Sequence, residues 1–141
     1  MLTLGSENEA YRMPNTNSSD PLPSTNSSLW TFSYDKLMLN KTEIIANGSA
    51  VFDASLAGIE MQHELFDKYM VAIKAVNSSV ICDTEGAQCG SSELSCQALN
   101  ETLPPFEMYI NGSICSLPVL AYAKDGFNGL NTGCSLMIAP R

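Results

Sequence analysis

Cysteine and histidine are the residue types here that most often bind metals or carry redox chemistry, and their spacing argues against both uses. The cysteines are Cys82, Cys89, Cys96, Cys115 and Cys134. Six residues separate the first two, where a zinc site has about two to four. His63 is the sole histidine of the sequence. We therefore expect no metal site and no cofactor, and we expect disulfides with one cysteine left over.

A second group of polar side chains lies around residue 62, where Glu60, His63 and Glu64 follow one another closely. A helix N-terminus favours carboxylates through the helix dipole. We interpret the two glutamates as a charged helix face and His63 as a solvent-facing residue at the helix start, without a catalytic role. Met61, Met70 and Met108 are interpreted as core residues.

The elements that must position such groups are mostly strands. Hydrophobic residues make up 45% of the chain and charged residues 16%, which is enough apolar material for a core. Period-two patterns predict strands within 2–11, 30–39 (kinked at 35–36), 49–53, 80–82, 106–110, 114–122 and from 136 onward. Asn47-Gly48 and Asn111-Gly112 are predicted as hairpin turns, and 14–28, 83–95 and 126–133 as loops.

One segment changes period. Over residues 61–75, Leu65, Tyr69 and Ile73 recur every four residues, which predicts an amphipathic helix of about four turns. Several short strands, tight turns and one helix predict a mainly β fold.

The order of these segments resembles the C-terminal lobe of the pepsin-like, cathepsin D-like aspartic proteases. Leu2-Thr3-Leu4-Gly5 is similar to the family's segment at the junction of the lobes, and Trp30 to Leu39 to its Trp-led strand. Ala50-Val51-Phe52-Asp53 resembles the strand that carries the second catalytic aspartate. The later motifs follow the family order: Cys96, Leu103-Pro104, Ile110-Asn111-Gly112, Leu117-Pro118, Tyr122 and Cys134.

The resemblance implies a partial lobe of the bilobal acid protease fold. Residues 1–29 would be an inter-lobe strand and a polar linker, and residues 30–141 most of the lobe. The first lobe, with its own aspartate, and the closing strands of this lobe are not in the sequence. The resemblance also implies a disulfide between Cys96 and Cys134. Proximity within one polar loop predicts the pair Cys82–Cys89, which leaves Cys115 unpaired and half-buried or paired with another chain.

Asp53 is the catalytic residue that the resemblance implies. In the family, two aspartates share one proton, one activating water and the other donating to the scissile carbonyl. The family motif is Asp-Thr/Ser-Gly-Thr/Ser, whereas this chain has Asp53-Ala54-Ser55-Leu56. Ser55 stands in place of the glycine and Leu56 in place of a bracing hydroxyl. Gln62 replaces the proline that opens the family's helix. The motif is therefore divergent, and Asp53 is either a working catalytic residue or a relic.

Seven Asn-x-Ser/Thr sequons indicate a glycosylated protein of the secretory pathway. They begin at Asn17, Asn26, Asn40, Asn47, Asn77, Asn100 and Asn111. The 11 asparagines and the Ser and Thr content would give about two sequons by chance. The sequence therefore predicts a secreted or lysosome-like, vacuole-like location.

Charge and hydropathy limit the partners. The net charge is −8 with seven scattered basic residues, which argues against nucleic acid. No apolar run approaches the roughly 18 residues of a membrane span. The expected partners are a polypeptide substrate and the missing N-terminal lobe.

Three functions stay open at this point. The first is part of an aspartic endopeptidase acting on polypeptides in an acidic compartment, inactive as this chain alone. The second is a non-catalytic relative that binds peptides or proteins. The third is a disulfide-bonded extracellular β domain without protease ancestry.

Overall fold

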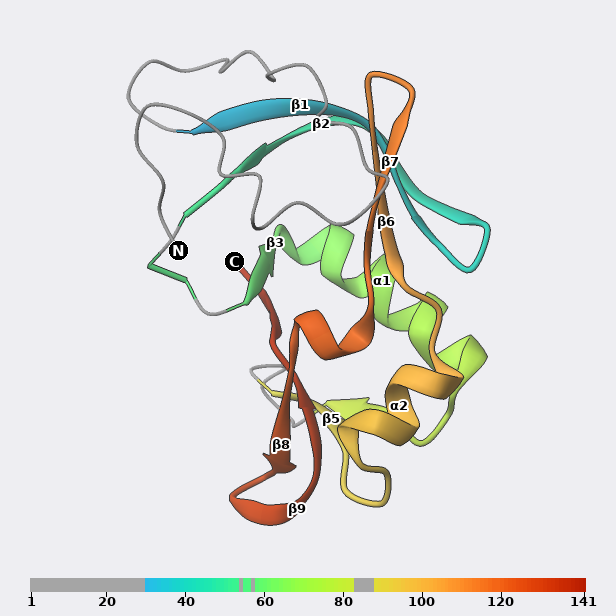
Figure 1. The fold of residues 1–141 in the computed structure, drawn as a ribbon, viewed down its shortest axis with the longest axis vertical. Coiled ribbons are helices and arrows are strands. Elements are labelled where there is room, and N and C mark those ends of the chain that lie inside the picture. The colour runs from blue at the N-terminus through green and yellow to red at the C-terminus, as the bar shows by residue number, and fades with distance from the viewer. Residues whose placement is uncertain (1–29, 54, 57, 83–87) are drawn as a thin grey trace, which may run out of the picture.

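The computed structural model describes residues 30–53, 55–56, 58–82 and 88–141 (Figure 1). The predicted strand within 2–11, the polar linker, and Asn17 and Asn26 lie outside the described residues. The described part is mainly β, as predicted, with three small sheets and two α-helices.

The first sheet carries the predicted Trp-led strand. It contains β1 (Thr31–Leu39), β2 (Thr42–Val51), β6 (Phe106–Ile110) and β7 (Ser113–Leu117), all antiparallel in the order β2-β1-β6-β7. The turn predicted at Asn111-Gly112 joins β6 to β7, and both of its residues have positive φ, 49° and 76°. The apolar face of this sheet turns Tyr34, Leu37 and Phe106 into the core.

The hairpin turn predicted at Asn47-Gly48 is wrong, because both residues lie within β2. The chain reverses at Asn40 and Lys41, with φ values of 47° and 65°. Gly48 lies opposite Tyr34, and a Cβ at this position would overlap the Tyr34 ring, so the glycine makes room for a cross-strand aromatic residue.

The kink predicted in β1 at Asp35 and Lys36 stays a prediction, although the burial pattern changes phase there, from Tyr34 to Leu37. A register shift follows between Leu37 and Met38, where β2 has one extra residue, Ile44. Such a bulge turns the extra side chain, and Ile44 is buried in the core.

A second antiparallel sheet, which we call the disulfide sheet, replaces two predicted loops. It contains β4 (Ile81–Cys82), β5 (Cys89–Ser91), β9 (Leu130–Leu136) and β8 (Ala123–Phe127) in the order β4-β5-β9-β8. The loop predicted at 83–95 contains β5. The loop predicted at 126–133 is a β8–β9 hairpin that turns at Asn128 and Gly129, with φ values of 51° and 76°.

Two helices pack among these sheets, where the sequence predicted one. The predicted helix is α1 (His63–Val76), which buries Phe66, Tyr69, Met70 and Ile73. The unpredicted α2 (Cys96–Thr102) begins at Ser95, whose hydroxyl accepts a hydrogen bond from the Ala98 N–H at 3.2 Å.

The strand predicted over 114–122 ends early. It stops at Leu117, and after Pro118 the chain forms a 3-10 helix, Val119–Ala121. Proline has no N–H for a sheet ladder, which fits the end of the strand.

The third sheet is a single parallel pair, β3 (Ile59–Met61) with β10 (Ile138–Pro140). It joins the segment that follows Asp53 to the C-terminal segment. The Ile59 N–H donates to the Met137 carbonyl at 2.8 Å, and the Arg141 N–H donates to the Met61 carbonyl at 2.6 Å.

The core lies between the helices and the first sheet. Tyr69 of α1 packs edge-to-face on Phe106, with ring centroids 5.8 Å apart, and its hydroxyl bonds the Tyr122 hydroxyl at 3.1 Å. Burial raises the pKa of both tyrosines, so both stay neutral and can share this hydrogen bond. Met61 and Met70 are buried and Met108 packs half-buried against the core, as predicted.

Candidate active site

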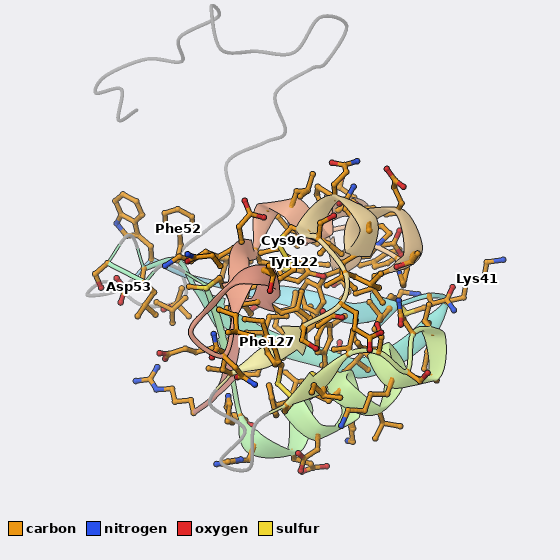
Figure 2. All side chains as sticks on the ribbon, turned by 90° about the horizontal axis from the view of Figure 1, so that it is seen from below. Lys41, Phe52, Asp53, Cys96, Tyr122 and Phe127 are labelled. Atoms are coloured by element: carbon orange, nitrogen blue, oxygen red, sulfur yellow. A yellow bond between two sulfur atoms is a disulfide. The ribbon has the colours of Figure 1, made fainter. Side chains whose placement is uncertain are left out.

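Asp53 follows β2 at the edge of the molecule, where Figure 2 shows it beside Phe52 and away from the packed core. The Phe52 N–H donates to the Trp30 carbonyl at 2.9 Å, and the two rings stack with centroids 6.1 Å apart. This pair fixes the end of the β1–β2 hairpin. Asp53 is thus held directly after a rigid element and faces solvent.

Ser55 is the hydrogen-bond partner of the Asp53 carboxylate. Oδ1 of Asp53 accepts from the Ser55 hydroxyl at 2.7 Å and from the Ser55 N–H at 2.9 Å. These two bonds lower the pKa of Asp53 below its usual value, and the charge of Arg141 lowers it further. Hydrogen bonds to the charged form favour it, so Asp53 stays ionised in weak acid.

A concave pocket of about 320 Å³ adjoins the Asp53 turn. The Leu56 N–H donates to the Asp53 carbonyl at 3.3 Å, which closes the turn and places Leu56 in the pocket wall. The other walls come from β3, from β10, from the end of β9 at Ser135 and Leu136, and from Gln88. Gly58 allows the close approach, since a Cβ there would overlap the Met137 carbonyl.

The residues around Asp53 leave a large apolar surface exposed. Trp30 is 65% exposed and Phe52 is 62% exposed, and Val51 and Leu56 are exposed beside them. We call these four residues together with Asp53 the open end. The sequence analysis missed this surface. Its signal was an aromatic residue at each outer end of the two paired strands.

The acidic pair beside the helix is separated in the structure, which corrects its interpretation as one helix face. Glu60 lies on β3 opposite Ala139, and only Glu64 is in the first turn of α1. Glu64 pairs with Lys68 at 2.9 Å, and that contact lowers the pKa of Glu64. Nε of Arg141 lies 3.9 Å from Oε2 of Glu60. His63 opens the helix and is exposed, as predicted.

Both predicted disulfides are present. Cys96 and Cys134 are bonded with Cα atoms 4.9 Å apart, and Cys82 and Cys89 with Cα atoms 4.0 Å apart. Cys115 is unpaired, as predicted, but it is exposed on β7 and not half-buried. The disulfides are compatible with an extracellular or secretory-pathway location.

The five sequons within the described residues fall into two groups. Asn40, Asn47 and Asn111 are exposed and have positive φ. Asn77 and Asn100 are half-buried and hydrogen-bonded into the fold. Nδ2 of Asn77 donates to the Thr102 hydroxyl at 3.2 Å, so one sequon is tied to the hydroxyl of another.

Among the described residues, no group of three His, Cys, Asp or Glu side chains could hold a metal ion. No helix in the described part of the chain has the length and apolar character needed to span a bilayer.

The scan against protein-family models found no match, and the search of curated proteins found none either.

Proposed function

We propose that this chain is most of one lobe of a pepsin-like aspartic endopeptidase of the secretory pathway. Asp53 would supply one of the two catalytic carboxylates, and a companion lobe would supply the other. The observation that carries the proposal is the Asp53 turn. An exposed carboxylate follows a rigid strand end, is held ionised by Ser55, and adjoins a pocket.

Within this proposal the two carboxyls divide the chemistry by sharing one proton. The ionised carboxylate takes a proton from water, and the protonated carboxyl donates a hydrogen bond to the scissile carbonyl. Two carboxyls about 3 Å apart titrate as a coupled pair, and one stays protonated in acid. Asp53 alone supplies one carboxyl where the reaction needs two, so the chain by itself is inactive.

The companion lobe would also complete the substrate cleft. The open end presents exposed apolar side chains near Asp53, among them Phe52 beside it in Figure 2, and a polypeptide substrate would lie between this surface and the other lobe. Positioning of the substrate supplies much of the rate in such reactions. The lysosome-like, vacuole-like or extracellular location belongs to the same proposal.

The test is peptide-library cleavage between about pH 3 and 6. The chain alone should not cleave. The protein produced with its companion lobe should cleave, and Asp53→Ala in that protein should abolish cleavage. Alanine is preferred to asparagine, because Asn at 53 would create the sequon Asn-Ala-Ser. Undiminished cleavage by the Asp53→Ala protein would reject the catalytic role.

A second candidate function, peptide binding without catalysis, is favoured by the exposed Trp30–Phe52 stack. Exposed aromatic residues in an apolar patch are typical of recognition surfaces. Leu56 also stands where the family's motif has a hydroxyl. Under this function Phe52→Ala weakens binding of extended peptides and Asp53→Ala leaves it unchanged. Peptide binding lost in Phe52→Ala, in a protein that never cleaves, would select this candidate.

A further inference from the structure

A second concave surface lies away from Asp53, between α1 and the turn of the β1–β2 hairpin. This groove has a volume of about 530 Å³. Leu39 and Ile44 line it from the hairpin, and Val71 and Val76 line it from α1. Figure 2 places Lys41, at the tip of this hairpin, on the side of the molecule opposite Asp53.

The helix side of the groove exposes apolar residues with no described partner segment over them. Val71 is 70% exposed, and Val76 is also exposed. Polar groups, Glu43, Asp67 and Lys68, also line the groove. An apolar groove with a few polar groups suits a compact ligand that has both apolar faces and hydroxyls.

The groove also contains a sequon. Asn40 and Thr42, the asparagine and the hydroxyl residue of Asn40-Lys41-Thr42, both line it. Asn40 is exposed in a turn with φ of 47°. The other exposed sequons, at Asn47 and Asn111, do not contribute their asparagines to the groove. A sugar on Asn40 is thus tethered where the groove begins.

We propose that Asn40 carries an N-linked glycan whose first sugars lie in this groove and cover Val71. In the modification, Nδ2 of Asn40 displaces the pyrophosphate of a lipid-linked oligosaccharide at the anomeric carbon of the first sugar. A C–N bond forms, the C–O bond to the lipid pyrophosphate breaks, and the amide loses one proton. The CH faces of the sugars pack on the valines, and their hydroxyls meet the polar rim.

The proposal rests on passage through the secretory pathway, but not on catalysis by Asp53. The chain is expressed in a eukaryotic host behind a cleavable secretion signal, and glycopeptides are identified by mass spectrometry. A glycan at Asn40 is expected. Absence of sugar at Asn40, alone or together with absence at the other sequons, overturns the proposal.

Occupation of the groove is tested by thermal unfolding. Thr42→Ala removes the sequon while keeping Asn40, and Thr42→Ser preserves it as the matched control. Removal of the glycan should lower the Tm by a few degrees and raise oxidative labelling of Val71. Ser113→Ala, which removes the exposed Asn111 sequon, should change neither. The same variants made in bacteria, without glycans, give the effect of the side chain alone.

A double-mutant cycle assigns the contact. If the sugars pack on Val71, then Val71→Ser should remove most of the Tm difference between glycosylated Thr42→Ser and unglycosylated Thr42→Ala protein. An unchanged difference in the Val71→Ser background overturns the proposal. A glycosylated protein that sediments as a dimer, and as a monomer after Val71→Ser, would assign the groove to a second copy and overturn it too.

Discussion

The disulfide sheet and the open end differ in how far their side chains are buried. In the disulfide sheet, Cys89, Cys134 and Ser91 are fully buried. The Cys82–Cys89 disulfide joins β4 to β5 within the sheet, and the Cys96–Cys134 disulfide joins β9 to α2. In the open end, the aromatic residues Trp30 and Phe52 face solvent although they pair with each other. The first region buries its side chains and so stabilises the fold. The second region leaves its own apolar side chains exposed to solvent.

This contrast predicts where substitutions are tolerated. Gly90 sits against β9 so closely that a Cβ would overlap the Cys134 carbonyl. Asp53, by contrast, touches Ser55 of its own turn and is exposed. A change in the Asp53 motif therefore alters chemistry at little cost to folding, whereas a change in β5 alters folding itself.

The largest effect is expected from loss of the longer disulfide. The double variant Cys96→Ala and Cys134→Ala should lower the free energy of unfolding by about 3–4 kcal/mol, because the unfolded chain regains the entropy of a large loop. The measurement is chemical denaturation. Cys115→Ala is the matched control, and it should change the free energy by less than about 0.5 kcal/mol because Cys115 is free and exposed. Equal losses in both proteins would contradict the contrast.

Gly90→Ala should be the next most severe change. The added methyl group meets backbone that cannot move without breaking the β5–β9 ladder, and overpacking of this kind costs about 1–3 kcal/mol or more. Gly129→Ala, in the β8–β9 turn, adds a methyl group to open space. Its cost comes from the φ of 76°, which alanine adopts less easily than glycine. It should cost about 1 kcal/mol. A Gly90→Ala protein as stable as the Gly129→Ala protein would show that β5 is less tightly packed than described.

Asn77→Ala should have an intermediate effect. Asn77 ends α1, and its side chain joins Thr102 at the end of α2 and the Ser79 N–H and hydroxyl. Loss of these partly buried bonds should cost about 1–2 kcal/mol in unglycosylated protein. Asn77→Asp keeps an acceptor for Ser79 and removes the donor to Thr102, so it should lose less. The prediction fails if the Asn77→Asp protein is less stable than the Asn77→Ala protein at neutral pH.

The smallest effect on stability, with a clear spectroscopic signal, is expected at Asp53. Ser55→Ala removes the hydroxyl bond and should raise the pKa of Asp53 toward its usual value in an NMR titration, while Ser55→Thr should keep it low. A lowered pKa in the folded state contributes stability above the pKa of the unfolded state, and that contribution is lost as the pH falls through the folded value. Because Asp53 is exposed, unfolding at neutral pH should hardly change. Identical titration curves for the three proteins would exclude Ser55 as the cause.

The sequence predicted the elements whose apolar residues recur at a regular spacing, every two residues in the strands and every four in the helix. The aromatic alternation of β1 indicated a strand and the four-residue spacing in α1 indicated burial on one helix face, and both elements are present. The two disulfides were also predicted. The resemblance to a protease lobe has no support from the comparisons and stays a proposal.

Elements built from turn-forming residues were missed for identifiable reasons. Asn and Gly tolerate positive φ, so Asn47-Gly48 and the segment 126–133 were both interpreted as non-strand. In the structure, Gly48 is part of a strand and leaves room for the Tyr34 ring. Within 126–133, the chain reverses at Asn128 and Gly129. β5 is short and contains Gly90, and α2 is too short to show a period. The apolar open end was missed because sequence periodicity does not tell a buried aromatic residue from an exposed one.

The two disulfides close consecutive loops of the chain that do not interlock. Cys82–Cys89 lies wholly before residue 90, and Cys96–Cys134 begins after residue 95. A proteolytic cut within either loop leaves all pieces covalently joined, whereas a cut at Ser92 or Glu93 separates the chain into two polypeptides. Those two would be held together by the pairings of β1 with β6, β3 with β10 and β5 with β9 and by the shared core, not by any covalent bond. A cut in this short segment therefore ends the covalent connection between the two parts, while the strand pairing and the core still join them.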